Sequence, residues 1–225
     1  MSTPELIVML TKNDHTAENA LEVFESCKDT RAKCWGAKEQ GIPLQQMKKL
    51  YDAFREYGKT SFLEVVAYNE KECIDGAKLA VQCGCDVLMG TLFFDSVCRI
   101  CRDNGIKYMP FVGKVSGRPS ILNGTAQEMI LEARERVEKG AWGIDLLGYR
   151  YTEDGYRLSK EVVRQCRVPV CLAGSIDSFS RLDQVMEIAP DFFTIGGAFF
   201  DGKFGQGFNC QINRVFDYIR TPATV

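Results

Sequence analysis

The sequences VPVCLAGS at residues 168–175 and DFFTIGGA at residues 191–198 share one design. Each is a short, almost wholly apolar run that closes on small residues, AGS in the first and GGA in the second. Strands that are buried on both faces have this continuous apolar character, and they belong to parallel sheets. The two runs therefore predict two buried parallel strands near the end of the chain, each followed by a tight turn.

Further apolar runs precede these two, and a helix-like segment follows every run. The predicted strands are, in order, Leu6–Thr11, Lys33–Glu39, Ser61–Tyr68, Asp86–Gly90, Ile106–Gly113, Trp142–Gly148, Val168–Ser175 and Asp191–Ala198. Regular alternation of apolar strands and helices is typical of a parallel sheet. Eight such repeats within 225 residues predict a single α/β domain over residues 1–225, a compact (β/α)8 or TIM barrel. The alternative is an open doubly wound sheet, which would favour a GxGxxG turn after the first strand that this chain lacks.

Local signals predict where individual helices begin. Thr125 and Glu128 fit a capping box at the start of a helix over residues 126–139, and Ser178 fits the N-cap of a helix over residues 179–188. The longest predicted loop, residues 115–124, precedes the first of these helices and has glycines near both ends. We expect this loop to act as a lid over the mouth of the barrel.

The composition is that of an ordinary globular protein, with 45% apolar and 26% charged residues. A formal net charge of −2 provides no basic face for nucleic acid or for an anionic membrane. No apolar run approaches the ~18 residues of a membrane-spanning helix, and the N-terminal residues lack the features of a signal peptide. We therefore expect a cytoplasmic protein without nucleic-acid or membrane partners; a homo-oligomer is left open.

The ten cysteines are expected to be reduced and mostly buried in a cytoplasmic protein. Four of them have a spacing that superficially resembles a four-thiolate zinc site, namely Cys83, Cys85, Cys98 and Cys101. The two pairs fall on opposite sides of a predicted strand, which carries the chain roughly 15 Å at ~3.3 Å per residue. We interpret them as core residues and predict no metal.

The small residues after the last two strands predict a phosphate site. Such residues expose backbone N–H groups, and a following helix N-terminus adds partial positive charge. In (β/α)8 barrels the loops after the seventh and eighth strands commonly bind phosphate. Gly174, Ser175, Gly196 and Gly197 are therefore the predicted phosphate-binding residues. The alternative is that these glycines only permit tight turns.

The sequences LAGSIDS at 172–178 and FTIGGAFF at 193–200 resemble the phosphate-binding end of the ribulose-phosphate-binding barrels. That group includes sugar-phosphate epimerases, decarboxylases, small aldolases and isomerases of histidine and tryptophan synthesis, so the resemblance implies a phosphorylated substrate. The chain has no DxKxxD motif on its third strand, only one histidine, and Asp145 where the small keto-acid aldolases have a lysine. The resemblance therefore implies a fold and a phosphate site but not one particular reaction.

Charged residues within or directly after apolar strands are the candidate catalytic groups, because an unpaired buried charge is costly. The candidates are Lys38, Glu64, Lys114 and Asp145. Strand alternation directs Glu64 and Asp145 to the inside of the barrel. A desolvated lysine, with Lys114 as first choice and Lys38 as second, would act as Schiff-base nucleophile or proton shuttle, and a carboxylate as general base. The alternative is that these residues form structural ion pairs.

The predicted loops at the mouth supply further polar groups for substrate binding. Asp14 follows the first strand, beside the only histidine, and Arg118 and Arg150 suit a carboxylate or a second phosphate. We expect a lyase or isomerase without a redox cofactor that performs aldol cleavage, epimerisation or isomerisation on a small phosphorylated sugar or keto acid. The alternatives are a phosphoribosyl-transferase-like barrel, usually Mg²⁺-dependent, and a barrel that binds a phosphorylated ligand without catalysis.

Overall fold

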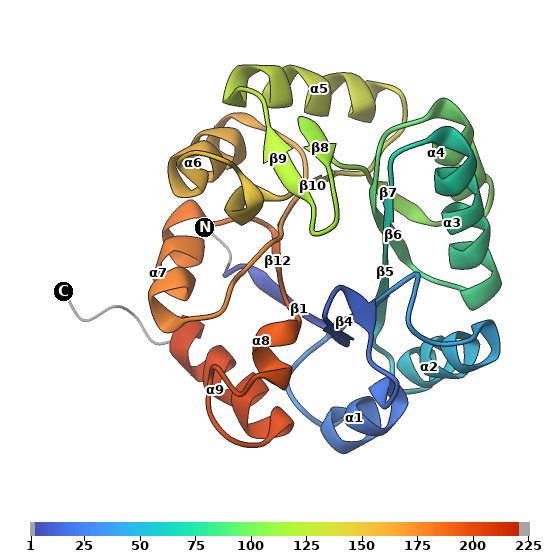
Figure 1. Ribbon diagram of the computed structural model, residues 1–225, viewed down its shortest axis with the longest axis vertical. Helices are drawn as coiled ribbons and strands as arrows, with labels where there is room; N and C mark the ends of the chain where they lie inside the picture. Colours follow the sequence, from blue (N-terminus) through green and yellow to red (C-terminus); the bar gives the residue numbers. More distant parts are fainter. Residues whose placement is uncertain (1–2, 221–225) are drawn as a thin grey trace.

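The strands of this protein form a parallel barrel surrounded by helices (Figure 1). The computed structural model describes residues 3–220. The barrel strands are β1 (Glu5–Met9), β4 (Cys34–Lys38), β5 (Thr60–Ala67), β6 (Val87–Thr91), β7 (Lys107–Met109), β10 (Ile144–Leu146), β11 (Val170–Leu172) and β12 (Phe192–Ile195). They lie in the order β10-β11-β12-β1-β4-β5-β6-β7. The predicted α/β (β/α)8 barrel is confirmed.

The barrel closes between β7 and β10. The backbone N–H of Trp142 donates to the carbonyl of Tyr108 at 2.9 Å, and that of Asp145 donates to the carbonyl of Pro110, also at 2.9 Å. A parallel bridge between Phe111 and Asp145 continues this seam. Closure leaves the sheet without a free edge and turns one face of every strand into the barrel interior.

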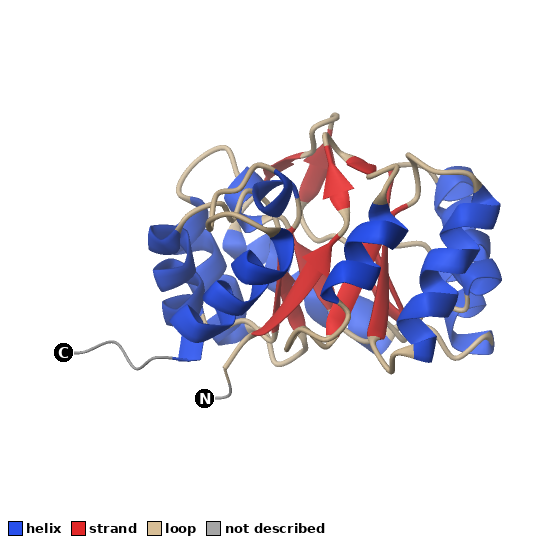
Figure 2. Ribbon diagram, turned by 90° about the horizontal axis from the view of Figure 1, so that it is seen from below, coloured by secondary structure: helices blue, strands red, loops and turns tan. Residues whose placement is uncertain are grey.

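Helices cover the outside of the barrel, and short hairpin strands lie at one end of it (Figure 2). The helices are α1 (Ala20–Cys27), α2 (Leu44–Glu56), α3 (Glu70–Cys83), α4 (Asp95–Asp103), α5 (Ala126–Glu138), α6 (Gly155–Gln165), α7 (Phe179–Ile188), α8 (Gly197–Phe200) and α9 (Phe208–Arg220), with a 3₁₀ turn η1 (Gly148–Arg150). The capping box of Thr125 and Glu128 is present, and the Ser178 hydroxyl accepts from the N–H of Arg181. Within residues 3–220, no helix has the length and apolar character needed to cross a membrane.

Two antiparallel hairpins follow barrel strands, β2 (Thr11–Lys12) with β3 (His15–Thr16) and β8 (Lys114–Ser116) with β9 (Ile121–Asn123). The second corrects the prediction of a long irregular loop over residues 115–124. In this hairpin Val115 pairs with Leu122, which is fully buried, so an apolar anchor stabilises the turn. The sequence signal was a strand-like alternation too short to stand out from a polar loop.

The barrel interior has its own small core below the end that carries the hairpins. It consists of Ile7, Met9, Cys34, Phe62, Val87, Met89, Met109 and Cys171. Gly36 makes this packing fit, because a Cβ at Gly36 would lie 2.5 Å from the sulfur of Met9 and 2.9 Å from the carbonyl oxygen of Phe62. A larger core fills the layer between strands and helices. The barrel interior is thus closely packed, and it forms the floor directly below the polar groups at the C-terminal ends of the strands.

Candidate active site

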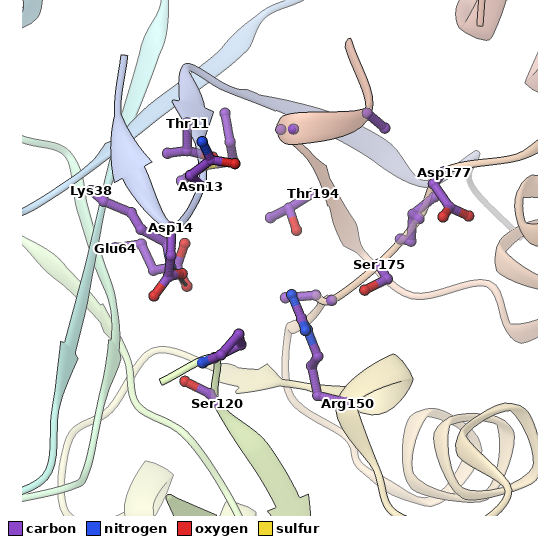
Figure 3. A pocket seen from close by; sticks show the side chains of 18 of the residues that line it. Thr11, Asn13, Asp14, Lys38, Glu64, Ser120, Arg150, Ser175, Asp177 and Thr194 are labelled. Carbon is purple, nitrogen blue, oxygen red and sulfur yellow. Dashed lines mark hydrogen bonds and ion pairs between the residues drawn. The ribbon is translucent and has the colours of Figure 1, made fainter. Parts of the chain in front are cut away.

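A cavity of about 710 Å³ opens at the C-terminal ends of the barrel strands. Figure 3 shows its side chains converging from several strands and loops. All of the predicted site residues line it except Lys114 and Asp145; those that do are Asp14, Lys38, Glu64, Arg118, Arg150, Gly174, Ser175, Gly196 and Gly197. The fold therefore gathers at one place residues that are far apart in the sequence.

The ammonium group of Lys38 lies between two carboxylates on one wall of this cavity (Figure 3). Its Nζ forms an ion pair with Oδ1 of Asp14 and lies 3.4 Å from Oε1 of Glu64. Lys38 and Glu64 are partners in the register of β4 and β5, which fixes their side chains next to each other. The Lys38 side chain is only 9% exposed and that of Glu64 13%, so water screens the cluster weakly.

Asp14 reaches this cluster through the tight turn of the β2–β3 hairpin. Asn13 and Asp14 have φ angles of 51° and 65°. Positive φ at both central residues is the requirement of a type I′ hairpin turn, and Asn and Asp tolerate it better than most residues. The hydroxyl of Thr16 attaches the hairpin to β4, because it donates to the carbonyl of Lys38 at 2.7 Å and accepts from the Lys38 N–H at 2.9 Å.

The cluster shifts the pKa values of both Lys38 and Glu64 upward. Burial lowers the pKa of Lys38, but the negative charges of Glu64 and Asp14 outweigh that effect and hold the ammonium group protonated. Burial raises the pKa of Glu64, the charge of Lys38 opposes the rise, and Asp14 and Glu39 add to it. The wall thus combines a stable cation with a carboxyl group that takes up a proton more readily than usual.

Asp145 does not line the cavity, although it lies inside the barrel as predicted. It is fully buried, and neither of its carboxyl oxygens has a hydrogen-bond partner among the described residues. Burial raises its pKa well above the ordinary value, the charge of Glu64 adds to this, and Lys38 acts in the opposite direction. The electrostatics therefore favour the neutral, protonated form of this carboxyl group.

The wall around Lys38, with Asp14, Glu64 and Arg118, is called the lysine wall below. The small residues after β11 and β12 form a separate part of the cavity (Figure 3). Gly174 has a φ of 107°, a value that disfavours residues with a side chain. A Cβ at Gly196 would collide with the hydroxyl of Thr11, whereas a Cβ at Gly197 would meet nothing within 4 Å. Gly196 is thus required by packing, and Gly197 leaves open space at the start of α8.

Two arginines line the cavity, as predicted, but their surroundings differ. Arg118, on the β8–β9 hairpin, donates to Oε1 of Glu39 at 2.9 Å and to the carbonyl of Val66. These hydrogen bonds of Arg118 therefore attach the β8–β9 hairpin to the end of β5. Arg150 is exposed, reaches into the cavity (Figure 3), and forms no ion pair with any residue between 3 and 220.

Lys114, the first choice for the catalytic lysine in the sequence analysis, is not brought into the cluster. Its side chain is exposed on β8 and does not line the cavity. Hydrogen bonds from Thr125 lower the pKa of Glu128, and the charge of Lys114 contributes, so Lys114 lies toward the start of α5. Gly113, with a φ of 79°, turns the chain before Lys114.

Several polar residues that line the cavity escaped the sequence analysis. They are Thr11, Asn13, Gln40, Ser120, Asp177, Thr194, Asp201 and Lys203. Thr194 carried a usable signal, because it is the one polar side chain inside the apolar run FFTI. Lys203 follows α8 in an irregular segment and had no such signal. Within the described part of the chain, no cluster of three or more His, Cys, Asp or Glu residues could hold a metal ion.

No known family model matches the chain, and no curated protein sequence matches it either. Solved structures of other proteins, in contrast, superimpose on this chain. A native KDPGal structure superimposes with a TM-score of 0.68 at 15% identity over 98% of this chain and 96% of its own. The N-acetylmannosamine-6-phosphate 2-epimerase of Clostridium perfringens gives 0.64 at 13% identity over 86% of both chains. The orotidine 5′-phosphate decarboxylase of Lactobacillus acidophilus gives 0.65 at 13% identity, over 97% of this chain and 100% of its own.

The chain shares its (β/α)8 barrel fold with these three proteins. The resemblance expected from the sequence is therefore confirmed at the level of the fold. Identities of this size carry no information about the reaction, which has to be argued from the side chains of this barrel itself.

The Thr16 hydroxyl is expected to be needed for the geometry of the lysine cluster. Thr16→Val keeps the shape of the side chain but removes both hydrogen bonds to the Lys38 backbone, so we expect a loss of about 1–3 kcal/mol in the free energy of unfolding. Thr16→Ser keeps the hydroxyl and should recover most of that loss. Urea denaturation of both variants tests this, and equal losses for the two would contradict it.

Asp145 should make the stability of the protein depend on pH. The pKa of Asp145 is higher in the folded than in the unfolded chain, so its protonated form stabilises the folded chain. This stabilising contribution is complete at pH values below the pKa in the unfolded chain, which is about 4. The contribution is lost as pH rises toward the folded pKa. Asp145→Asn removes the ionisation, and the Tm of the variant minus that of the wild type should increase from pH 4 to pH 7.5. A difference in Tm that stays constant over this range speaks against the assignment.

Proposed function

We propose that the protein is an enzyme that binds a small phosphorylated sugar or keto acid and acts on it as an isomerase or a lyase. The phosphate would lie at Gly174, Ser175, Gly196 and Gly197. The open space at Gly197 and the left-handed backbone at Gly174 support this site, since both let an anion approach the main chain. Two proteins with this fold, the epimerase and the decarboxylase above, carry a phosphorylated substrate in their names.

The placement of the Lys38 ammonium between Asp14 and Glu64 is the observation that carries the proposal for the chemistry. In the proposed step, the carboxylate of Glu64 takes a proton from a carbon next to a carbonyl group. The electron pair of the broken C–H bond moves toward the carbonyl oxygen, and the charge of Lys38 stabilises the resulting enolate. Delivery of a solvent proton to the other face of that carbon gives an epimer, and return of the proton from Glu64 to the neighbouring carbon gives an isomer.

The pKa directions favour proton transfer over a Schiff base on Lys38. A Schiff-base lysine has to lose its proton before it attacks, and such lysines have lowered pKa values. The two carboxylates instead raise the pKa of Lys38. Aldol cleavage remains compatible with this wall, because Glu64 could take the proton of a substrate hydroxyl group while the carbon–carbon bond breaks and the electron pair passes to the carbonyl.

Exchange of substrate hydrogen with D2O tests the chemistry. NMR of wild-type protein with a panel of ketopentose and ketohexose phosphates and phosphorylated keto acids should show deuterium entering next to the carbonyl of at least one compound. Lys38→Met and Glu64→Gln should reduce the exchange rate by at least ~100-fold. Lys114→Met is the matched control and should retain it. Absence of exchange with wild-type protein, or loss of it only in Lys114→Met, would refute the proposed step; thermal melts verify that each variant is folded.

Titration with inorganic phosphate tests the binding site separately. Gly197→Ala places a methyl group in open space, so the Tm should change little, while phosphate affinity should fall about tenfold or more, equivalent to ~1.4 kcal/mol. Isothermal titration calorimetry measures the affinity. Unchanged phosphate binding in this variant would mean that the anion binds elsewhere.

A further inference from the structure

We propose that the cavity selects monophosphates whose other end is uncharged and hydroxylated, and that it disfavours substrates with a second anionic group such as a carboxylate. This inference rests on the proposed function and narrows its substrate class. It is carried by the distribution of charged side chains in the cavity, where the cations near the reacting end already have carboxylate partners.

The lysine wall contains no cation that could receive a substrate carboxylate. Lys38 is engaged by Asp14 and by Glu64, and Arg118 is engaged by Glu39 at 2.9 Å and by a backbone carbonyl. A carboxylate placed here would meet carboxylates that are weakly screened, since the side chains of Glu64 and Glu39 are each only 13% exposed.

Of the lysines and arginines that line the cavity, Arg150 and Lys203 have no ion-pair partner among residues 3–220. The Cγ of Arg150 is 3.3 Å from the position that a Cβ on Gly174 would take, so this arginine belongs to the phosphate side. The exposed carboxylates of Asp177 and Asp201 also lie on the rim of the cavity. One phosphate dianion therefore uses the available positive charge, and nothing is left for a further anionic group.

The same wall is well suited to hydroxyl groups. Carboxylates are only acceptors of hydrogen bonds, and a substrate hydroxyl can donate to them, whereas a substrate carboxylate cannot. Asp14, with a side chain that is 29% exposed, offers such an acceptor to the cavity. Thr11, Asn13 and Thr194 add neutral groups that both donate and accept (Figure 3).

A matched pair of ligands tests the inference. D-Arabinitol 5-phosphate and 5-phospho-D-arabinonate differ only in a terminal CH2OH or carboxylate group. Calorimetric titration of the full chain at low ionic strength should give at least tenfold tighter binding of the alditol phosphate. Asp14→Asn removes one negative charge from the wall and should reduce this ratio several-fold. Asp52→Asn, on the exposed side of α2, removes the same charge far from the cavity and should leave the ratio unchanged.

The outcomes separate this inference from the proposed function on which it rests. Tighter binding of the alditol, with a ratio that depends on Asp14, supports the inference. Equal or tighter binding of the arabinonate overturns the inference while leaving the phosphate site intact. An identical effect of Asp14→Asn and Asp52→Asn overturns it as well, because the selectivity would then reflect overall charge. Failure of both ligands and of inorganic phosphate to bind overturns the proposed phosphate site itself.

Discussion

The cavity of this protein depends on a buried lysine held between carboxylates. Removing Lys38 from water is costly, and only the pairing with Asp14 and Glu64 makes its charged form tolerable. The pairing in turn requires the β4–β5 register, the left-handed turn at residues 13–14 and the two hydrogen bonds of Thr16. A cluster that buries more carboxylates than cations loses their hydration and contributes little to the stability of a fold. We therefore associate it with function.

Barrel closure explains why the cluster has a rigid base. The seam between β7 and β10 places Asp145 inside the barrel, and Gly36 lets Met9 and Phe62 pack below the strand ends. Close packing leaves side chains few alternative rotamers, so the polar groups at the strand ends keep defined positions. The buried, unpartnered Asp145 is the exception in this floor, because its neutral form is the one that such an environment accepts.

The fold and the chemistry of this chain rest on different kinds of observation. Structures of proteins with different names superimpose on it at identities between 12% and 16%, so the barrel alone does not distinguish among their reactions. The proposed reaction instead follows from a protonated lysine next to a carboxylate, and the proposed selectivity follows from the lack of surplus positive charge on that wall.

The sequence by itself determined the barrel, because strands buried on both faces are legible as apolar runs such as VPVCLAGS at residues 168–175. It also determined which glycines face the cavity, since these stand at the C-terminal ends of the predicted strands. Only the tertiary structure decided which charged residues meet. A hairpin turn brings Asp14 to Lys38, and no sequence periodicity encodes that turn. Lys114 follows a strand closely in the sequence, but the backbone at Gly113 directs it away from the cavity. Strand patterns are local, whereas a contact between charges depends on the path of the whole chain.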